Sequence, residues 1–150
     1  MNTVLLTGIM VYQFILSGIS NMQPKYDDQL KIDLARVIVT AGQKYDIDPV
    51  LMYKIIAVES HFKFISINKS GDYSMTQINC RVWRKEFKRM KRKLHCGRLI
   101  GDYRYSIEKM AEILSIIKMR HPNESDWFGR YHSGTPRLKR KYLSKLRNID

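Results

Sequence analysis

The chain has 150 residues, of which 44% are hydrophobic and 11% aromatic, which is enough for one compact domain with a real core and argues against disorder. This length excludes a large multidomain enzyme. Lys and Arg number 27 against 14 Asp and Glu, and the resulting formal charge of +13 predicts an anionic partner: nucleic acid, a membrane surface or a bacterial cell wall.

The chain begins with an apolar segment, residues 4–19, that has no ionisable side chain apart from one tyrosine. At about 1.5 Å per residue, a helix of this length is shorter than the bilayer core of about 30 Å. Gly18 and Ser20 supply small residues at positions −3 and −1 of a signal cleavage site before Asn21. We therefore predict a signal peptide over residues 1–20, export to the periplasm or beyond the cell, and one domain over residues 21–150. An uncleaved membrane anchor and a buried N-terminal helix are the alternatives.

Cys80 and Cys96 are the only cysteines. In an exported chain such a pair predicts a disulfide, here closing a loop of about 15 residues and stabilising the fold by roughly 3 kcal/mol. Neither the cysteines nor the histidines have the spacing of a zinc site, so we predict no metal and no cofactor.

The rest of the chain has mostly helical periodicity, with no repeat and no linker. An amphipathic helix is predicted over about residues 30–45. Asp48 followed by Pro49 predicts the N-cap and first position of a second helix, which ends near Ser60. Apolar residues surround this second helix, which predicts a buried central position. Turn-forming residues then predict an irregular, hairpin-like region near residues 64–80.

Further helices are predicted toward the C-terminus. Apolar residues at helical spacing indicate helices over 83–94, 107–117 and 136–146, with a short segment at 127–131 between the last two. The predicted fold class is therefore mainly α, a helical bundle around the central helix with one small hairpin.

Glu59 is the strongest candidate for a catalytic carboxylate. It lies at the end of the most apolar helix, with Val58 before it and Phe62 after it. Such surroundings disfavour the ionised form, so the carboxyl can carry a proton near neutral pH and act as a general acid. On composition alone, an exposed Glu at a helix end is the more common arrangement.

Three short elements accompany this residue along the chain: Glu59-Ser60-His61-Phe62, then Ser74-Met75-Thr76-Gln77-Ile78-Asn79, then Tyr131-His132-Ser133-Gly134. In order and spacing they resemble the SLT-type lytic transglycosylases of the lysozyme-like superfamily, especially the small single-domain members of secretion systems and phages. The resemblance covers about residues 30–145. It implies an α+β lysozyme-like fold and cleavage of peptidoglycan glycan strands.

The resemblance also implies roles for single residues. Glu59 matches the catalytic glutamate of the family. The residues that match its substrate-binding or cleft-shaping positions are Ser60, Gln77, Asn79, Tyr131, Ser133 and Gly134. Their donors and acceptors suit an N-acetyl sugar, which presents amide and hydroxyl groups. Polar core residues that satisfy a turn are the alternative for each of them.

Three positions depart from the family pattern. Ser74 stands where the family has Gly, Thr76 where it has Met, and His132 where it has Asn. If the glycine is needed for a positive φ, Ser74 costs stability there. A neutral imidazole at His132 can replace the asparagine, because both groups offer a donor and an acceptor.

Asp72 is the one nearby candidate for a second carboxylate, and an Asp that caps backbone amides in a turn is the alternative. In a lytic transglycosylase Glu59 acts alone and the product has a 1,6-anhydromuramoyl end. In a muramidase Asp72 assists and water gives a reducing end. We predict the transglycosylase and retain the muramidase as the alternative.

The positive charge is concentrated in two segments. Residues 81–95 contain eight Lys and Arg and one Glu, and residues 136–147 contain six more basic residues and no acid. Because no recognised nucleic-acid-binding fold is present, we predict docking to anionic wall polymers or membrane surfaces and no specific nucleic-acid partner. A protein that binds the wall without turnover is the remaining alternative. We expect a monomer that serves a secretion, conjugation or phage assembly.

Overall fold

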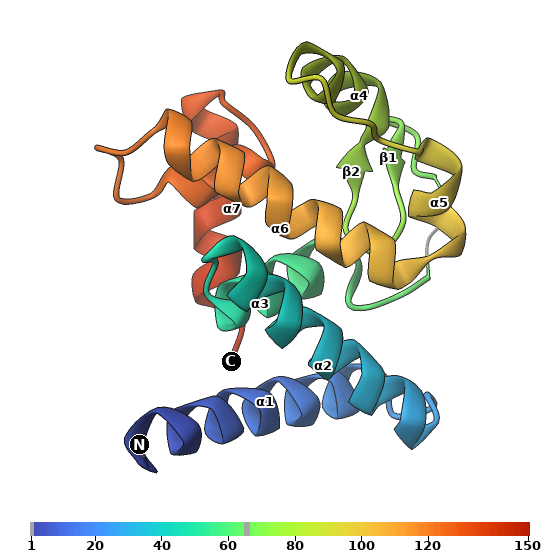
Figure 1. Ribbon diagram of the computed structural model, residues 1–150, viewed down its shortest axis with the longest axis vertical. Helices are drawn as coiled ribbons and strands as arrows, with labels where there is room; N and C mark the ends of the chain where they lie inside the picture. The colour runs from blue at the N-terminus through green and yellow to red at the C-terminus, as the bar shows by residue number, and fades with distance from the viewer. Residues whose placement is uncertain (1, 65–66) are drawn as a thin grey trace.

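The computed structural model of the chain describes residues 2–64 and 67–150, with side chains from residue 7 onward. The described residues form seven α-helices, one 3-10 helix and a two-stranded sheet (Figure 1). In chain order these are α1 (Asn2–Met22), α2 (Asp28–Tyr45), α3 (Pro49–Ser60), β1 (Asp72–Tyr73), β2 (Ile78–Asn79), α4 (Cys80–Arg89), α5 (Cys96–Gly101), α6 (Tyr103–Arg120), η1 (Trp127–Tyr131) and α7 (Pro136–Arg147). The mainly α fold with a small hairpin is therefore confirmed.

Local signals set the ends of α3. The Asp48 carboxylate accepts a hydrogen bond of 2.9 Å from the Val50 N–H, and Pro49 occupies the first turn, as predicted. The helix ends at Ser60 because His61 takes a left-handed conformation, with φ of 52°. Glu59 therefore lies in the last turn of α3.

α3 is the central helix. Its residues with no exposed surface are Met52, Tyr53, Ile55, Ile56 and Ala57. Helices α1, α2 and α7 pack around it (Figure 1). Burying a large apolar side chain contributes roughly 1.5–3 kcal/mol, so this packing fixes the helix that carries Glu59.

α1 packs against α2 and α3 through Ile15 and Ile19, whose side chains are fully buried. Gly18 permits the close approach, because a Cβ at this position would lie 2.1 Å from the hydroxyl oxygen of Tyr53. In the full chain α1 is thus a packed N-terminal helix, which was one of the alternatives to a signal peptide. Removal of residues 1–20 on export stays a prediction. No helix in the described part of the chain is long and apolar enough to cross a membrane.

The hairpin and α4 are joined without a linker. In the antiparallel sheet Asp72 pairs with Asn79, and α4 begins at the next residue, Cys80. The predicted disulfide is confirmed, joining Cys80 to Cys96 at the start of α5, with Cα atoms 5.8 Å apart.

The helix expected over residues 83–94 is shorter than predicted. It ends at Arg89, and Lys91 has φ of 56°, a left-handed conformation that an α-helix cannot include. Leu94 is nevertheless only 5% exposed, because it reaches the core from the loop that follows.

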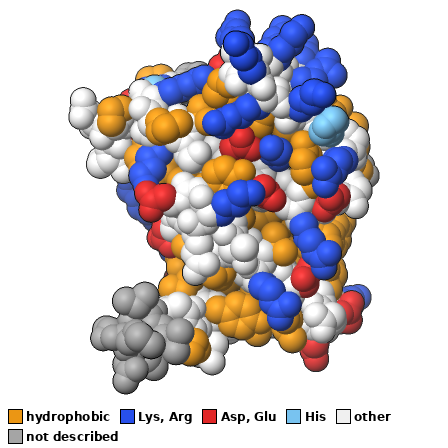
Figure 2. All heavy atoms as spheres, in the orientation of Figure 1, with side chains coloured by type: hydrophobic (Ala, Val, Ile, Leu, Met, Phe, Trp, Pro, Cys, Tyr) orange, Lys and Arg blue, Asp and Glu red, His pale blue; other side chains and the backbone are white. Residues whose placement is uncertain are grey.

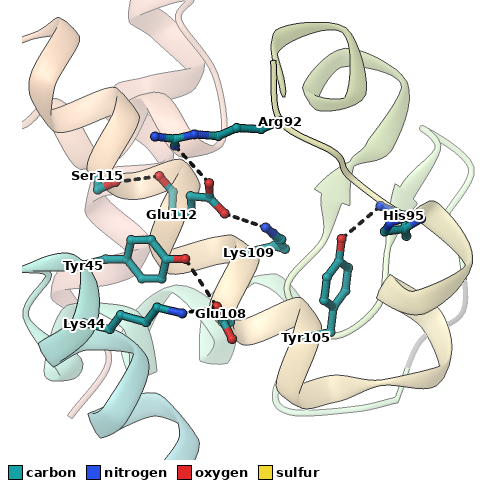
Figure 3. Close-up of polar contacts among 9 residues, drawn as sticks. All are labelled: Lys44, Tyr45, Arg92, His95, Tyr105, Glu108, Lys109, Glu112 and Ser115. Carbon is teal, nitrogen blue, oxygen red and sulfur yellow. Dashed lines mark hydrogen bonds and ion pairs between the residues drawn. The ribbon is translucent and has the colours of Figure 1, made fainter. Parts of the chain in front are cut away.

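α6 crosses the middle of the molecule and holds this loop in place (Figures 1 and 3). The buried carboxylate of Glu112 accepts hydrogen bonds from Arg92 at 3.0 Å and from Lys109 at 2.7 Å. The backbone N–H of His95 donates to the hydroxyl of Tyr105 at 3.0 Å. Contacts from α6 therefore fix the loop between α4 and α5 independently of the disulfide.

Candidate functional site

A cleft of about 680 Å³ lies at the C-terminal end of α3, between the hairpin, α4, η1 and α7. Its volume is typical of a ligand-binding site. The predicted site residues that line it together are Glu59, Asp72, Gln77, Asn79 and Tyr131. The fold thus brings together residues that lie up to 72 positions apart along the chain.

Glu59 is mostly buried but faces the cleft, and 12% of its side chain is exposed. Its Oε1 atom lies 3.7 Å from Nδ1 of His132, in the turn after η1. This contact raises the pKa of His132 above its usual value, while partial burial and the charge of Lys145 oppose the shift. A protonated His132 therefore forms an ion pair with Glu59.

Tyr142 of α7 lies beside this pair. Its ring stacks on the imidazole of His132, with centroids 4.7 Å apart and planes 9° apart. Its hydroxyl is buried and has no hydrogen-bond partner among the described residues. Burial and the negative charge of Glu59 hold its pKa well above the usual value, so the hydroxyl keeps its proton. The sequence indicated Tyr142 only as an apolar position of a helix.

The polar side chains of the hairpin bind one another. Asn68 donates from Nδ2 to Asp72 Oδ2 at 2.9 Å and to Gln77 Oε1 at 2.6 Å. Gln77 Nε2 donates in turn to the backbone oxygen of Ser74 at 2.7 Å. Both ends of the Gln77 amide are thus used within the hairpin, which keeps the cleft wall in shape. The sequence predicted Asn68 only as a turn former, and its Oδ1 atom does accept a turn hydrogen bond of 2.8 Å from the Ser70 N–H.

Asn79 and Tyr131 connect the elements that surround the cleft. Asn79 Oδ1 accepts from the Val82 N–H at 3.2 Å and so caps α4. The Tyr131 hydroxyl donates to the backbone oxygen of Thr76 at 2.7 Å, which ties η1 to the hairpin. Burial and then the charge of Glu59 raise the pKa of Tyr131 well above its usual value, so this donor is retained.

Three residues that the resemblance assigned to the site lie outside the cleft lining in the described structure. Ser60 is 4% exposed, and its hydroxyl donates to the backbone oxygen of Ile56 at 3.3 Å. Ser133 accepts from the Thr135 N–H at 3.1 Å through Oγ, and Gly134 is exposed beside it, so the two residues form the turn into α7. Their contact with substrate stays a prediction.

Ser74 has a strained backbone conformation, and hydrogen bonds of its side chain compensate for part of the strain. Its φ of 62° is a left-handed conformation, which explains a glycine at this position and costs an L-residue about 1–2 kcal/mol. Its buried hydroxyl forms hydrogen bonds of 3.0 Å with Ser106 and with Thr76. These bonds offset much of the cost, since each contributes about 1 kcal/mol.

Several cleft residues were not singled out from the sequence: Asn68, Ser70, Val82, Trp83, Arg130 and Lys145. Trp83 is one of the apolar residues whose helical spacing predicted the helix over residues 83–94, and in the structure it is half-buried and offers an apolar surface to the cleft. Helical spacing alone cannot separate a core face from a cleft wall. In the part of the chain that the structure describes, no group of three or more His, Cys, Asp or Glu residues is arranged to hold a metal ion.

Comparison with known proteins agrees with this arrangement. The family model described as transglycosylase SLT domain matches residues 36–146, a span that includes α3, the hairpin, α4, η1 and nearly all of α7. No curated protein and no solved structure shows a significant similarity to the chain. Because the family match covers most of the chain and contains the whole cleft, the chain belongs to the transglycosylase SLT domain family.

Proposed function

We propose that the protein is a peptidoglycan lytic transglycosylase in which Glu59 is both general acid and general base. Family membership supports cleavage of peptidoglycan in general. The observation that supports Glu59 is its position, because it is a largely buried carboxylate that faces the cleft from the rigid central helix. Asp72, the other carboxylate of the cleft lining, already accepts a hydrogen bond from Asn68.

The proposed reaction begins from the state in which Glu59 carries the proton and His132 is neutral. Glu59 donates its proton to the glycosidic oxygen between N-acetylmuramic acid and N-acetylglucosamine, and the bond from that oxygen to C1 of the muramoyl sugar breaks. The 2-acetamido group of the substrate stabilises the positive charge at C1. The Glu59 carboxylate then removes the proton of the muramoyl C6 hydroxyl as its oxygen bonds to C1. The product has a 1,6-anhydromuramoyl end, no water is consumed, and Glu59 regains its proton.

A muramidase is the second candidate, because Asp72 lines the same cleft as Glu59. In that reaction Asp72 stabilises C1 and a water molecule attacks it, which leaves a reducing end. Mass spectrometry of the released muropeptides separates the two, since an anhydro end is lighter by one water. The transglycosylase proposal predicts anhydro ends and an active Asp72→Asn variant. Reducing ends, with activity lost in Asp72→Asn, would establish the muramidase instead.

We also propose that the protein is exported and docks to anionic wall polymers or membrane surfaces. Lys and Arg gather over α4 at one end of the molecule (Figure 2). The exposed ones that make no ion pair within the described structure are Arg81, Arg84, Lys85, Lys88, Lys91 and Lys93. Raised salt should therefore weaken pelleting with sacculi more than it slows cleavage of short soluble glycans. If pelleting does not depend on salt, these basic residues do not mediate docking.

The biological purpose that fits a small domain of this kind is local opening of the wall for a secretion, conjugation or phage assembly. Zymography on purified cell wall tests whether the protein is an enzyme at all. Clearing by the wild type supports turnover. Pelleting with sacculi without clearing would instead support a protein that binds the wall and has no activity.

A further inference from the structure

We propose that a second, basic cavity beside the cleft binds the carboxylates of the stem peptide carried by peptidoglycan. This inference rests on the proposed function, because it concerns the same substrate. The cavity has a volume of about 300 Å³ and lies between the hairpin turn and the first turn of α4. It is lined by Lys69, Ser70, Gly71, Tyr73, Asn79 and Arg81. We call it the basic cavity.

The basic cavity is continuous with the cleft. Ser70 and Asn79 line both of them. Asn79 also donates from Nδ2 to the backbone oxygen of Ser70 at 3.4 Å, so the two residues that separate the cleft from the basic cavity are bonded to each other. A group attached to a sugar in the cleft can therefore extend past Ser70 and Asn79 into the basic cavity.

The two spaces differ in charge. The cleft lining combines the carboxylates of Glu59 and Asp72 with the cations of Arg130 and Lys145. The lining of the basic cavity has two cations, Lys69 and Arg81, and no acidic residue. Both cations are exposed, and neither forms an ion pair with any residue that the structure describes. A peptide carboxylate is attracted by the basic cavity, where no acidic side chain opposes the two cations. The guanidinium of Arg81 can bind a carboxylate through two parallel hydrogen bonds.

The shape of the basic cavity suits a peptide. Gly71 has φ of 80°, and a Cβ placed there would have no atom within 4 Å, so the turn leaves open space. Tyr73, which is half-buried, supplies an aromatic wall. In peptidoglycan the stem peptide hangs from the lactyl group of the muramoyl sugar and carries the free carboxylates of an otherwise neutral glycan. The substrate therefore brings its negative charge close to the cleft through this peptide.

The test compares two soluble substrates: short glycan fragments that carry stem peptides, and the same fragments after hydrolysis of the amide bond to the peptide, which leaves only the lactyl carboxylate on each muramoyl sugar. The wild type should cleave the peptide-bearing fragments with the higher kcat/KM. The double variant Lys69→Gln, Arg81→Gln should lower kcat/KM on the peptide-bearing fragments about threefold to tenfold, through KM, as two solvent-exposed charge contacts would. Its rate on the stripped fragments should not change.

The matched control is Lys25→Gln, Lys63→Gln, which removes the same charge at two exposed positions outside both cavities. It should leave both substrates unaffected. An equal loss on the two substrates, or no loss with the Lys69, Arg81 variant, would overturn the inference.

A binding measurement separates this inference from the proposed function. Calorimetry with the Glu59→Gln protein should show tighter binding of peptide-bearing than of stripped fragments, and the added Lys69 and Arg81 changes should remove the difference. This result requires no turnover. A wild type that cleaves neither fragment would overturn the proposed function, while equal binding of both fragments would overturn the basic cavity alone.

Discussion

The disulfide between Cys80 and Cys96 gives a prediction whose magnitude follows from the structure. The two residues are 16 positions apart, and closing a loop of this length removes freedom from the unfolded chain worth roughly 3 kcal/mol. For a chain of 150 residues each kcal/mol corresponds to about 2–4 °C in Tm. Replacing both cysteines with alanine should therefore lower Tm by about 6–12 °C.

Alanine is the suitable replacement because Cys80 is only 1% exposed, and a serine would bury a hydroxyl. The fold should persist in the variant. Arg92 still binds Glu112, and the His95 N–H still donates to Tyr105, so the loop remains attached to α6 (Figure 3). The variant should therefore unfold in one cooperative transition at a lower temperature.

Thermal unfolding followed by circular dichroism measures the effect. The reduced wild type should have the same Tm as the double alanine variant, and the reductant should not change the Tm of that variant. If thiol titration shows full reduction and the wild type still melts at its oxidised Tm, the loop-closure reasoning is refuted.

Three further predictions concern His132, Gly18 and Ser74. Because Glu59 raises the pKa of His132, the pair stabilises the fold fully below the ordinary histidine pKa of about 6.5, and this contribution is lost as pH rises through the raised value. NMR titration should place the pKa of His132 lower in Glu59→Gln than in wild type, and equal values would contradict the contact. Gly18→Ala should destabilise the full chain by about 1–3 kcal/mol through contact with Tyr53, whereas Gly8→Ala, with no atom within 4 Å of its Cβ, should not; equal melting would show that α1 is not packed in solution. Ser74→Gly should be more stable than Ser74→Ala by about 1 kcal/mol in denaturant unfolding, because only glycine relieves the left-handed backbone; the reverse order would refute this.

Much of the fold could be predicted because its signals are local. Asp48 and Pro49 mark the start of α3, and apolar residues on all sides of that helix indicate its central position. The end of α4 could not be predicted in this way. Lys91 takes a left-handed conformation that no local residue preference indicates, and the apolar spacing continues past it to Leu94. In this loop the contacts with α6 decide the backbone, and they come from a distant part of the sequence.

The residues of the candidate site also differ in whether local sequence or tertiary packing reveals them. The resemblance identified Glu59 and Tyr131, since they belong to short ordered motifs, and the structure places both at the cleft. Asn68 and Tyr142 have no such motif. Asn68 matters because the hairpin brings it to Asp72, and Tyr142 because α7 packs beside His132. Their positions follow from tertiary packing, which the periodicity of a single helix does not contain.

We propose that Glu59 alone drives a transglycosylase reaction. The most direct measurement is mass spectrometry of the muropeptides released from purified sacculi by wild type and by Glu59→Gln. We expect 1,6-anhydromuramoyl ends with the wild type and no release with Glu59→Gln. Reducing ends from the wild type, or anhydro ends that persist in Glu59→Gln, would contradict it.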